Sequence, residues 1–306
     1  MNHRILVVGA AGFIGRHLVR ALQNDGWTVR AQVHRCIGEF PADVEVIDSD
    51  TPASMAIADC DAVAWLAAAT TPASSAEDCS REVHQNLAPL CAALQAMPLA
   101  PTPPHLVYFS SGGTLYGDVN EPAEESFPLH PRSNYAAGKA AAELFIAACA
   151  QRTGLRATIL RPSNVYGPGQ ALHGGFGVIP AAMDCLLQLR PMTVWGDGNS
   201  LRDYLYIDDF IHAVALVLRS PPCRGMQTYN VCSGYETRLN DLLGRIERVS
   251  GRQLQRDYRA ARGTDLARVA LNGNLLRRTL GWQSAVGLDD GLRQTWEWFS
   301  SQTSLT

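Results

Sequence analysis

The chain has 306 residues, of which 46% are hydrophobic and 18% are charged, and its formal net charge at pH 7 is −3. This length and composition are sufficient for one large α/β domain that carries a smaller one, and the near-neutral charge gives no reason to expect nucleic acid or an anionic membrane surface as a partner. Eight scattered cysteines with no Cys-x-x-Cys pair exclude a disulfide framework and a zinc site, so no metal is expected.

The first half of the chain alternates strands with helices. Six apolar runs are predicted strands: Arg4–Gly9, Thr28–Val33, Val44–Asp48, Ala62–Leu66, His105–Ser110 and Arg156–Arg161. Three segments with apolar residues at three- and four-residue spacing are predicted helices: Phe13–Asn24, Arg81–Met97 and Asn134–Thr153. This alternation predicts an α/β fold with a Rossmann-type, doubly wound parallel sheet. The strand that begins at Arg4 leaves no room for a leader, and no apolar run spans a bilayer, so we expect a cytoplasmic protein.

The second half is less regular. A Gly- and Pro-rich stretch follows Arg161, and then come a predicted helix near Val178–Leu189 and a short strand at Met192–Val194. We expect the apolar segment Tyr204–Leu218 and the strand-like Gln227–Val231 to return to the large sheet. The expected dinucleotide-binding domain therefore comprises residues 1–168 and 203–232. A smaller, mostly C-terminal α/β substrate-binding region comprises residues 169–202 and 233–306.

A glycine-rich turn, residues 9–15, joins the first strand to the first helix. Glycine permits unusual backbone angles and close approach of a pyrophosphate, and a helix N-terminus offers N–H groups with partial positive charge. The turn therefore predicts a dinucleotide site, although a ligand-free strand-to-helix turn would have the same glycines. The expected contacts are Gly9, Gly12, Phe13, Ile14 and Gly15.

The ends of the next strands bear on the choice between NAD and NADP. The second strand ends without the acidic residue that would bond the adenosine ribose of NAD, and it is followed by His34 and Arg35, which favour the 2′-phosphate of NADP unless they are solvated loop residues. Asp48 closes the third strand and is expected to accept from the adenine amino group. Leu66, Ala67 and Ala68 follow the fourth strand and let a cofactor lie against the sheet edge.

Tyr135 and Lys139 lie four residues apart at the start of a predicted helix, and therefore on one face of it. A tyrosine hydroxyl titrates near ~10, but an ammonium and a positive nicotinamide ring both favour the phenolate, so Tyr135 is the candidate acid or base. Lys139 is expected to bond the nicotinamide ribose as well. The fifth predicted strand precedes this helix, and hydroxyls at Ser110, Ser111 and Thr114 lie at or just after its end. This is the edge of the sheet where the active sites of α/β enzymes lie.

Four motifs occur in a characteristic order: the turn at residues 9–15, Ser-Ser-Gly-Gly-Thr-Leu-Tyr-Gly at 110–117, Tyr-x-x-x-Lys at 135–139, and Leu-Arg-Pro-Ser-Asn-Val-Tyr-Gly-Pro-Gly at 160–169. Together they resemble the NAD-dependent epimerase/dehydratase family of extended short-chain dehydrogenases/reductases. The resemblance continues through residues 195–204, 206–209, 229–231 and 280–282, nearly to the end of the chain.

The resemblance implies further site residues in this chain. Asn164 resembles the asparagine that contacts the diphosphate of a nucleotide sugar, and Arg202 resembles the arginine that pairs with its phosphates. Arg262 and Asp265 resemble the late pair that holds the diphosphate and the nucleoside ribose, and an ordinary surface ion pair is the alternative. Ser110 and Pro162 are expected at the cofactor, and Ser111, Gly112 and Thr114 at the substrate.

Two positions depart from the family pattern. The usual catalytic Ser or Thr falls on Gly112, so Ser111 or Thr114 is expected to replace it, or the proton relay is weaker. Asn272 stands where many relatives have aspartate.

The resemblance implies an NAD- or NADP-dependent nucleotide-sugar enzyme, with a UDP- or dTDP-sugar as partner. The expected activity is a UDP-hexose 4-epimerase that passes through a 4-keto sugar. The alternatives are an NADPH-dependent reductase of 4-keto sugar nucleotides and a catalytically silent regulatory protein of the same fold. A dehydratase is disfavoured, because Gly113 and Thr114 replace its acidic pair. A homodimer is expected through the helices at 81–97 and 134–153, and the alternative is that these helices are covered within one subunit.

Overall fold

The computed structural model describes residues 3–34, 40–170, 177–220, 224–262 and 265–303. The chain divides into two compact units. The first comprises residues 1–111, 133–161 and 211–229, and the second comprises 112–132, 162–210 and 230–306. This division differs from the expected domain ranges, which placed 112–132, 162–168, 203–210 and 230–232 in the dinucleotide-binding part. Long-range contacts account for part of the difference, since the Tyr116 hydroxyl donates to Asn230 Oδ1 at 2.8 Å.

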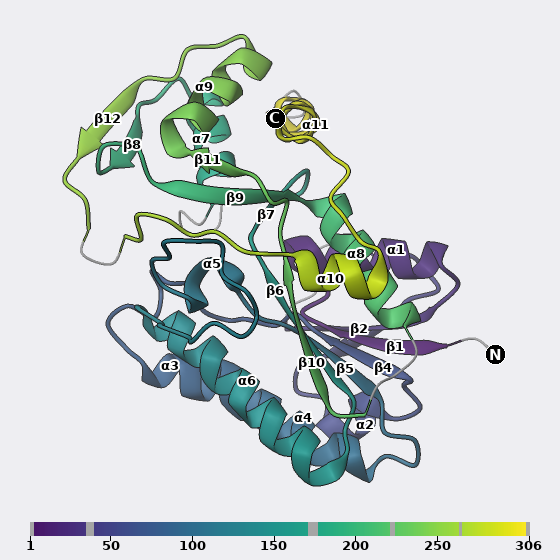
Figure 1. Cartoon of the computed structure of the whole chain (residues 1–306). Helices are drawn as coiled ribbons and strands as arrows, with labels where there is room; N and C mark the ends of the chain where they lie inside the picture. The colour runs from purple at the N-terminus through teal and green to yellow at the C-terminus, as the bar shows by residue number, and fades with distance from the viewer. Residues whose placement is uncertain (1–2, 35–39, 171–176, 221–223, 263–264, 304–306) are drawn as a thin grey trace. The chain divides into compact units, whose positions relative to one another are not determined.

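A seven-stranded sheet forms the centre of the first unit, with the strand order β10-β6-β5-β4-β1-β2-β3 (Figure 1). In this order, each pair of neighbouring strands from β6 across to β3 is parallel, as the sequence predicts for a doubly wound fold. The strand order reverses at β1, whose neighbours are β2 and β4, and such a switch point is where α/β sheets bind dinucleotides. The strands are β1 (Arg4–Val8), β2 (Thr28–Val33), β3 (Glu45–Asp48), β4 (Ala62–Trp65), β5 (His105–Phe109), β6 (Ala157–Pro162) and β10 (Met226–Val231).

Helices cover both faces of this sheet (Figure 1). Apolar side chains of α2, α4 and α6 form one core with the strands, including Leu90 and Ile146, which are almost fully buried. On the other face α1 and α8 are joined by an ion pair of 2.5 Å between Arg219 and Asp25. The helices are α1 (Phe13–Asn24), α2 (Ala53–Ile57), α3 (Ser80–Glu82), α4 (Ala88–Ala96), α6 (Asn134–Thr153) and α8 (Ile207–Arg219).

The predicted helix at 81–97 is present but is not uniform. A π-helical turn at Val83–Leu87 separates α3 from α4, and a 3₁₀ turn at Met97–Leu99 follows α4. Pro89 lies in the first turn of α4 and has no N–H to donate to a preceding carbonyl, which is a local reason for the irregular hydrogen bonding.

Helix α6 begins and ends where its sequence predicts. The hydroxyl of Ser133 accepts from the Ala136 backbone N–H at 3.1 Å, which caps the first turn. At the other end, Gly154 takes a left-handed φ of +72°, which few other residues adopt without strain. These two caps set the register that places Tyr135 in the first turn and Lys139 in the second.

The second unit contains two small sheets, in the orders β11-β9-β7 and β12-β8. The predicted helix near 178–189 and the strand at 192–194 are present. Residues 204–218 do not add a strand to the large sheet, because 204–206 belong to β9 of a small sheet and 207–218 belong to α8. Strand β10 does join the large sheet as expected. The elements are α5 (Gly112–Leu115), β7 (Asn164–Tyr166), α7 (Val178–Leu187), β8 (Met192–Trp195), β9 (Leu201–Tyr206), β11 (Glu236–Arg238), α9 (Leu239–Ser250), β12 (Arg256–Arg259), α10 (Asn274–Leu280) and α11 (Leu288–Thr303). Within the described ranges, none of the helices has the length and apolar content needed to cross a bilayer.

Candidate active site

The turn between β1 and α1 is too tight for side chains at two of its glycines. Gly9 has a left-handed φ of +87°, and a Cβ there would lie 2.9 Å from the backbone nitrogen of Ala67. A Cβ on Gly15 would lie 2.4 Å from the carbonyl oxygen of Gly9 and 2.7 Å from that of Ala10. The glycines therefore allow α1 to start directly against the end of β1.

The N-terminus of α1 suits an anion. Gly12 caps the helix without a side-chain hydrogen bond, and the described first turn contains no acidic residue. The first N–H groups of a helix carry partial positive charge and have no partner within the helix. The backbone N–H groups of Phe13 and Ile14 are therefore suited to bind the pyrophosphate of a dinucleotide. The glycines of the turn would leave space for it.

Gly15→Ala is expected to lower the free energy of unfolding by about 1–3 kcal/mol and to weaken dinucleotide binding by about tenfold or more. The added methyl group must push α1 away from the carbonyls of Gly9 and Ala10. Gly244→Ala is the matched control, because Gly244 is also helical and its Cβ would meet open space; alanine there should stabilise α9 by up to about 1 kcal/mol. Urea denaturation and cofactor titration calorimetry measure both effects, and unchanged affinity in Gly15→Ala would contradict the assignment of the turn.

The end of β4 lies beside the glycine turn. The Leu66 N–H donates to the Val8 carbonyl at 2.9 Å. The backbone of Ala67 lies so close to Gly9 that there is no space for a side chain at position 9. Ala67 is half-buried and Ala68 is exposed. The structure thus brings these expected cofactor residues to one edge of the sheet.

His34 and Asp48 come together at the ends of β2 and β3. His34 Nδ1 shares a hydrogen bond of 3.0 Å with the Ser49 hydroxyl, which lies 3.4 Å from Asp48 Oδ1. Both His34 and Asp48 are exposed. Arg35 lies outside the described residues, so the preference for NADP that rested on it stays a prediction.

Tyr135 and Lys139 lie one turn apart on α6. Lys139 Nζ donates to the Phe109 carbonyl at 2.8 Å, which holds the ammonium at the end of β5. The same atom lies 4.9 Å from the ring centre of Tyr108 and 5.9 Å from that of Tyr135. The cation is therefore held by one carbonyl and faces two aromatic rings.

Burial moves the pKa values of this pair away from their usual range. It raises the pKa of Tyr135 to about 12, and the Glu82 carboxylate adds to the rise. It lowers the pKa of Lys139 to about 8, against the opposing effect of the Glu82 and Glu143 carboxylates. In the chain without a cofactor, desolvation therefore outweighs the effect of the ammonium on Tyr135. The expected ionisation near neutral pH also relies on the positive nicotinamide ring, and it stays a prediction.

A buried ion pair lies next to Lys139. Arg161, near the end of β6, donates from Nε to Glu143 Oε1 at 3.0 Å and from Nη2 to Oε2 at 2.6 Å. The Ser110 hydroxyl donates to the same Oε1 at 2.6 Å. Ser110 therefore orients Glu143, and its expected contact with a cofactor stays a prediction. Sequence reasoning did not include Glu143, although its position four residues after Lys139 places it on the same face of α6.

Glu82 is a second buried carboxylate that the sequence reasoning missed. It is 4% exposed, and its Oε2 accepts from Asn86 Nδ2 at 2.7 Å. A Cβ on Gly138 would lie 2.6 Å from this oxygen, so the carboxylate lies directly against α6. No sequence signal marks it, because acidic residues at the start of helices are usually solvated.

The candidate hydroxyls after β5 are accessible. Ser111 and Thr114 are half-buried, and α5 begins at the buried Gly112. Asn164 lies beside this helix, since a Cβ on Gly113 would be 3.7 Å from its Oδ1. Which hydroxyl replaces the one missing at Gly112 stays a prediction.

Arg202 and Asn164 both bond to the backbone of the second unit. Asn164 Nδ2 donates to the Asp203 carbonyl at 2.8 Å. Arg202 donates from Nη1 to the Leu201 carbonyl at 2.8 Å and from Nη2 to the Leu266 carbonyl at 2.7 Å, and burial lowers its pKa. Two backbone carbonyls thereby orient the guanidinium.

Arg262 and Asp265 lie close together. Asp265 Oδ2 accepts from the Arg262 backbone N–H at 3.0 Å, and the Arg262 guanidinium lies 3.9 Å from the ring centre of Trp195. Asp265 also acts electrostatically on Arg202, so the structure brings these three expected substrate residues into one neighbourhood. Pro162 is buried at the end of β6.

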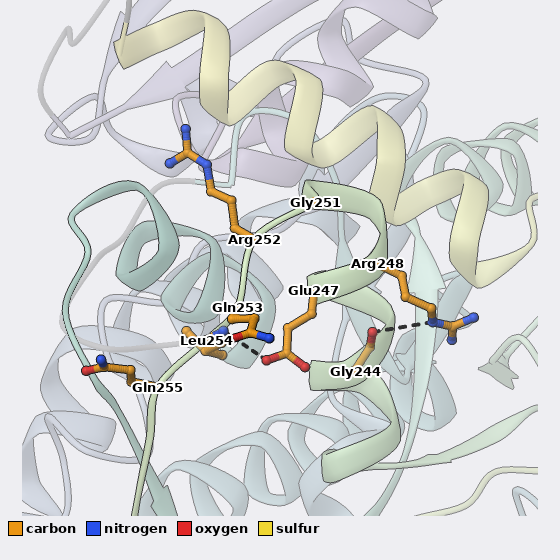
Figure 2. Close-up of a pocket in the computed structure, with 8 residues that line it drawn as sticks. All are labelled: Gly244, Glu247, Arg248, Gly251, Arg252, Gln253, Leu254 and Gln255. Atoms are coloured by element: carbon orange, nitrogen blue, oxygen red, sulfur yellow. Dashed lines mark hydrogen bonds between the residues drawn. The ribbon is translucent and has the colours of Figure 1, made fainter.

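A pocket of about 440 Å³ lies at the C-terminal end of α9, and none of the expected site residues lines it (Figure 2). Its polar groups bond to the protein itself: the Leu254 N–H donates to Glu247 Oε1 at 2.8 Å, and Arg248 Nε donates to the Gly244 carbonyl at 3.4 Å. Glu247 also pairs with Arg256. Glu247 and Arg248 are therefore held by bonds to other groups of the protein.

The parallel sheet, the glycine turn after β1 and the Tyr-x-x-x-Lys pair on α6 define an extended short-chain dehydrogenase/reductase. Residues 5–232 match the family model described as NAD dependent epimerase/dehydratase family. The chain belongs to this family.

Full-length relatives share the sequence and the fold. The chain is 33% identical to UDP-glucose 4-epimerase of Mycolicibacterium smegmatis, over 98% of this chain and 99% of the relative. The crystal structure of UDP-glucose 4-epimerase with UDP-glucose from Thermotoga maritima has a TM-score of 0.91 at 27% identity, over 98% of this chain and 99% of that one. The UDP-glucose 4-epimerase complex with NAD from Thermus thermophilus has a TM-score of 0.88 at 32% identity, over 97% and 99%. Reductases and dehydratases of nucleotide sugars also occur among the relatives.

Proposed function

We propose that this chain is a nucleotide-sugar epimerase that inverts C4 of a UDP-hexose with a tightly held NAD or NADP. The observation that carries the proposal is the Tyr135–Lys139 pair, with Lys139 bonded to the Phe109 carbonyl at the end of β5. Full-length similarity to UDP-glucose 4-epimerases, including complexes with UDP-glucose and with NAD, supports this reading over other activities of the family.

The chain's own residues supply proton transfer and orientation. Tyr135 takes the proton from the sugar hydroxyl and later returns it, and Lys139 orients the site through its bond to the Phe109 carbonyl. When bound, the nicotinamide ring supplies reversible hydride transfer at the sugar carbon. Ser111 or Thr114 bonds the same sugar oxygen. The resulting 4-keto sugar rotates within the site, so that the hydride returns to the opposite face of C4 and its configuration is inverted.

The nucleotide part of the substrate is proposed to bind the second unit. Asn164 and Arg202 are oriented by backbone carbonyls, and Arg262 stacks on Trp195 near Asp265. Guanidinium groups suit a diphosphate, and a carboxylate suits ribose hydroxyls. Uridine or thymidine is the proposed base, by family resemblance.

Incubation of the purified protein with UDP-glucose tests the function. Proton NMR of the sugar ring should show UDP-galactose accumulating to an equilibrium mixture without net use of added cofactor. UDP-N-acetylglucosamine is the second substrate to test. Failure to turn over any UDP- or dTDP-sugar, with a dinucleotide bound, would contradict the proposal and favour a catalytically silent protein of the same fold.

A reductase of 4-keto sugar nucleotides is the second candidate. It is favoured by the end of β2, where His34 stands in place of an acidic residue. Among the relatives, a GDP-6-deoxy-D-mannose reductase of Pseudomonas aeruginosa is 29% identical over 96% of this chain. Consumption of NADPH in proportion to product would identify this activity.

We also propose a homodimer in the cytoplasm. Helix α6 exposes Leu144 and Phe145, which are 71% and 49% exposed, and Val83 is 49% exposed on the neighbouring helical segment. Large apolar side chains at these positions suit a helix-to-helix interface. The described cysteines, including Cys79 and Cys91, are free thiols, in keeping with a reducing compartment. Sedimentation equilibrium tests the dimer, and the mass of a single chain would contradict it.

A further inference from the structure

Glu82 is a buried acid that the proposed reaction does not use. It is 4% exposed, and among the described residues its Oε1 is buried without a hydrogen-bond partner. Its other oxygen, Oε2, is held by Asn86, whose own Oδ1 accepts from the Ala69 backbone N–H at 2.8 Å. A buried carboxylate with one oxygen unpaired is costly unless a nearby opposite charge compensates for it.

Helix α6 shows where the carboxylate of Glu82 acts. Oε2 lies against Gly138, close enough that a Cβ there would be 2.6 Å away. Gly138 is three residues after Tyr135 and immediately before Lys139, so the carboxylate lies against the part of α6 that carries the catalytic pair. Glycine at this position leaves the space that the carboxylate occupies.

The charges around Lys139 leave one carboxylate to balance it. Glu143 is also near, but Arg161 binds both of its oxygens, and the two side chains are 6% and 8% exposed. Lys139 bonds directly to the neutral carbonyl of Phe109. Glu82 is therefore the acid on this side of α6 that has no cation of its own among the described residues.

We propose that Glu82 is a positioning residue of the catalytic site, whose buried carboxylate balances the ammonium of Lys139 and keeps Tyr135 in its neutral form until substrate and cofactor are bound. The inference rests on the proposed function, because it assigns Glu82 a role in that acid–base chemistry. Glu82 acts through Lys139 and Tyr135, and it is not a proton donor or acceptor to the sugar.

The sign of the expected pH effect follows from the facing groups. The groups near Lys139 include Glu82 of α3, Glu143 of α6 and the Tyr108 ring of β5. Glu82, the Lys139 ammonium and Tyr108 lie near Tyr135. Glu82 raises the pKa of both members of the pair. Without its charge both pKa values fall, so the phenolate forms at lower pH and the ammonium is also lost at lower pH. The whole bell-shaped profile of kcat/KM then moves toward acid.

Glu82→Gln removes the charge and keeps the size of the side chain. The pKa of Tyr135, followed by NMR of ¹³Cζ-labelled tyrosine with Tyr135→Phe to identify its signal, should fall from about 12 by about one pH unit. The kcat/KM profile should move toward acid by about the same amount. Glu82→Asp keeps the charge and should retain the wild-type profile. Glu77→Gln removes an exposed carboxylate five residues earlier and should change neither measurement.

The two measurements separate this inference from the proposed function. If Tyr135 titrates in Glu82→Gln as it does in the wild type, the inference is overturned even when the enzyme is active. If no sugar nucleotide is turned over but the titration moves as expected, the proposed function fails and the electrostatic coupling of Glu82 stands. Glu82→Met is a second neutral variant of similar length, and it gives the same titration readout if glutamine prevents folding.

Discussion

Tyr135→Phe is expected to reduce kcat by about 10²–10⁴-fold, because it removes the one hydroxyl placed to exchange a proton with the sugar. Lys139 keeps its bond to the Phe109 carbonyl and the glycine turn is untouched, so dinucleotide binding should change by no more than a few-fold. Initial rates with UDP-glucose and calorimetric titration of the cofactor measure the two effects separately.

Tyr235→Phe is the matched control for this loss. It removes the same atom from a side chain that is 77% exposed, and its rate should equal that of the wild type. A Tyr135→Phe enzyme with undiminished kcat would remove Tyr135 from the mechanism. An equal loss of cofactor binding and rate would instead assign Tyr135 a structural role.

Glu143→Met is expected to lower the free energy of unfolding by about 3–5 kcal/mol. Arg161 is 8% exposed at its side chain and would remain as a buried cation without its bidentate partner, and the Ser110 hydroxyl would lose its acceptor at 2.6 Å. Urea denaturation followed by circular dichroism measures the change. The loss should be much larger than for an exposed ion pair, because buried charges are little screened by water.

Two further variants test the cause. Replacing both partners, Glu143→Met with Arg161→Met, should recover most of the stability, since both buried charges are then removed together. Asp290→Asn breaks a pair with Arg293 whose side chains are 63% and 56% exposed, and it should cost less than about 1 kcal/mol. A double variant as unstable as Glu143→Met alone would show that packing, and not the loss of the ion pair, determines the loss of stability.

The elements that local sequence controls were predicted closely. The expected helix at 134–153 has the same bounds as α6, because the Ser133 cap, an alanine-rich interior and the left-handed Gly154 all lie within the helix or next to it. The helix predicted at 81–97 was less accurate, since the spacing of apolar residues does not reveal the π-helical turn that precedes Pro89. Motif order identified the family, which the full-length relatives confirm.

The electrostatic environment of the candidate site could not be predicted in the same way. Glu82 has the sequence context of a solvated acid, and its burial depends on Asn86 and on the space left by Gly138, 56 residues further along the chain. The high pKa of Tyr135 likewise follows from desolvation by neighbours that the chain brings together only on folding. The Tyr-x-x-x-Lys spacing contains no information on either effect.

Local sequence specifies the alternation of strands and helices, the glycine turn and the spacing of Tyr135 and Lys139, because periodicity, caps and turn residues act over a few neighbours. Which charges are buried together depends instead on contacts between residues far apart in the chain. Arg161 meets Glu143 across 18 residues, and Arg202 donates to a carbonyl 64 residues away. Such pairings depend on how the sheets and helices pack, and burial then sets the pKa values on which the chemistry depends.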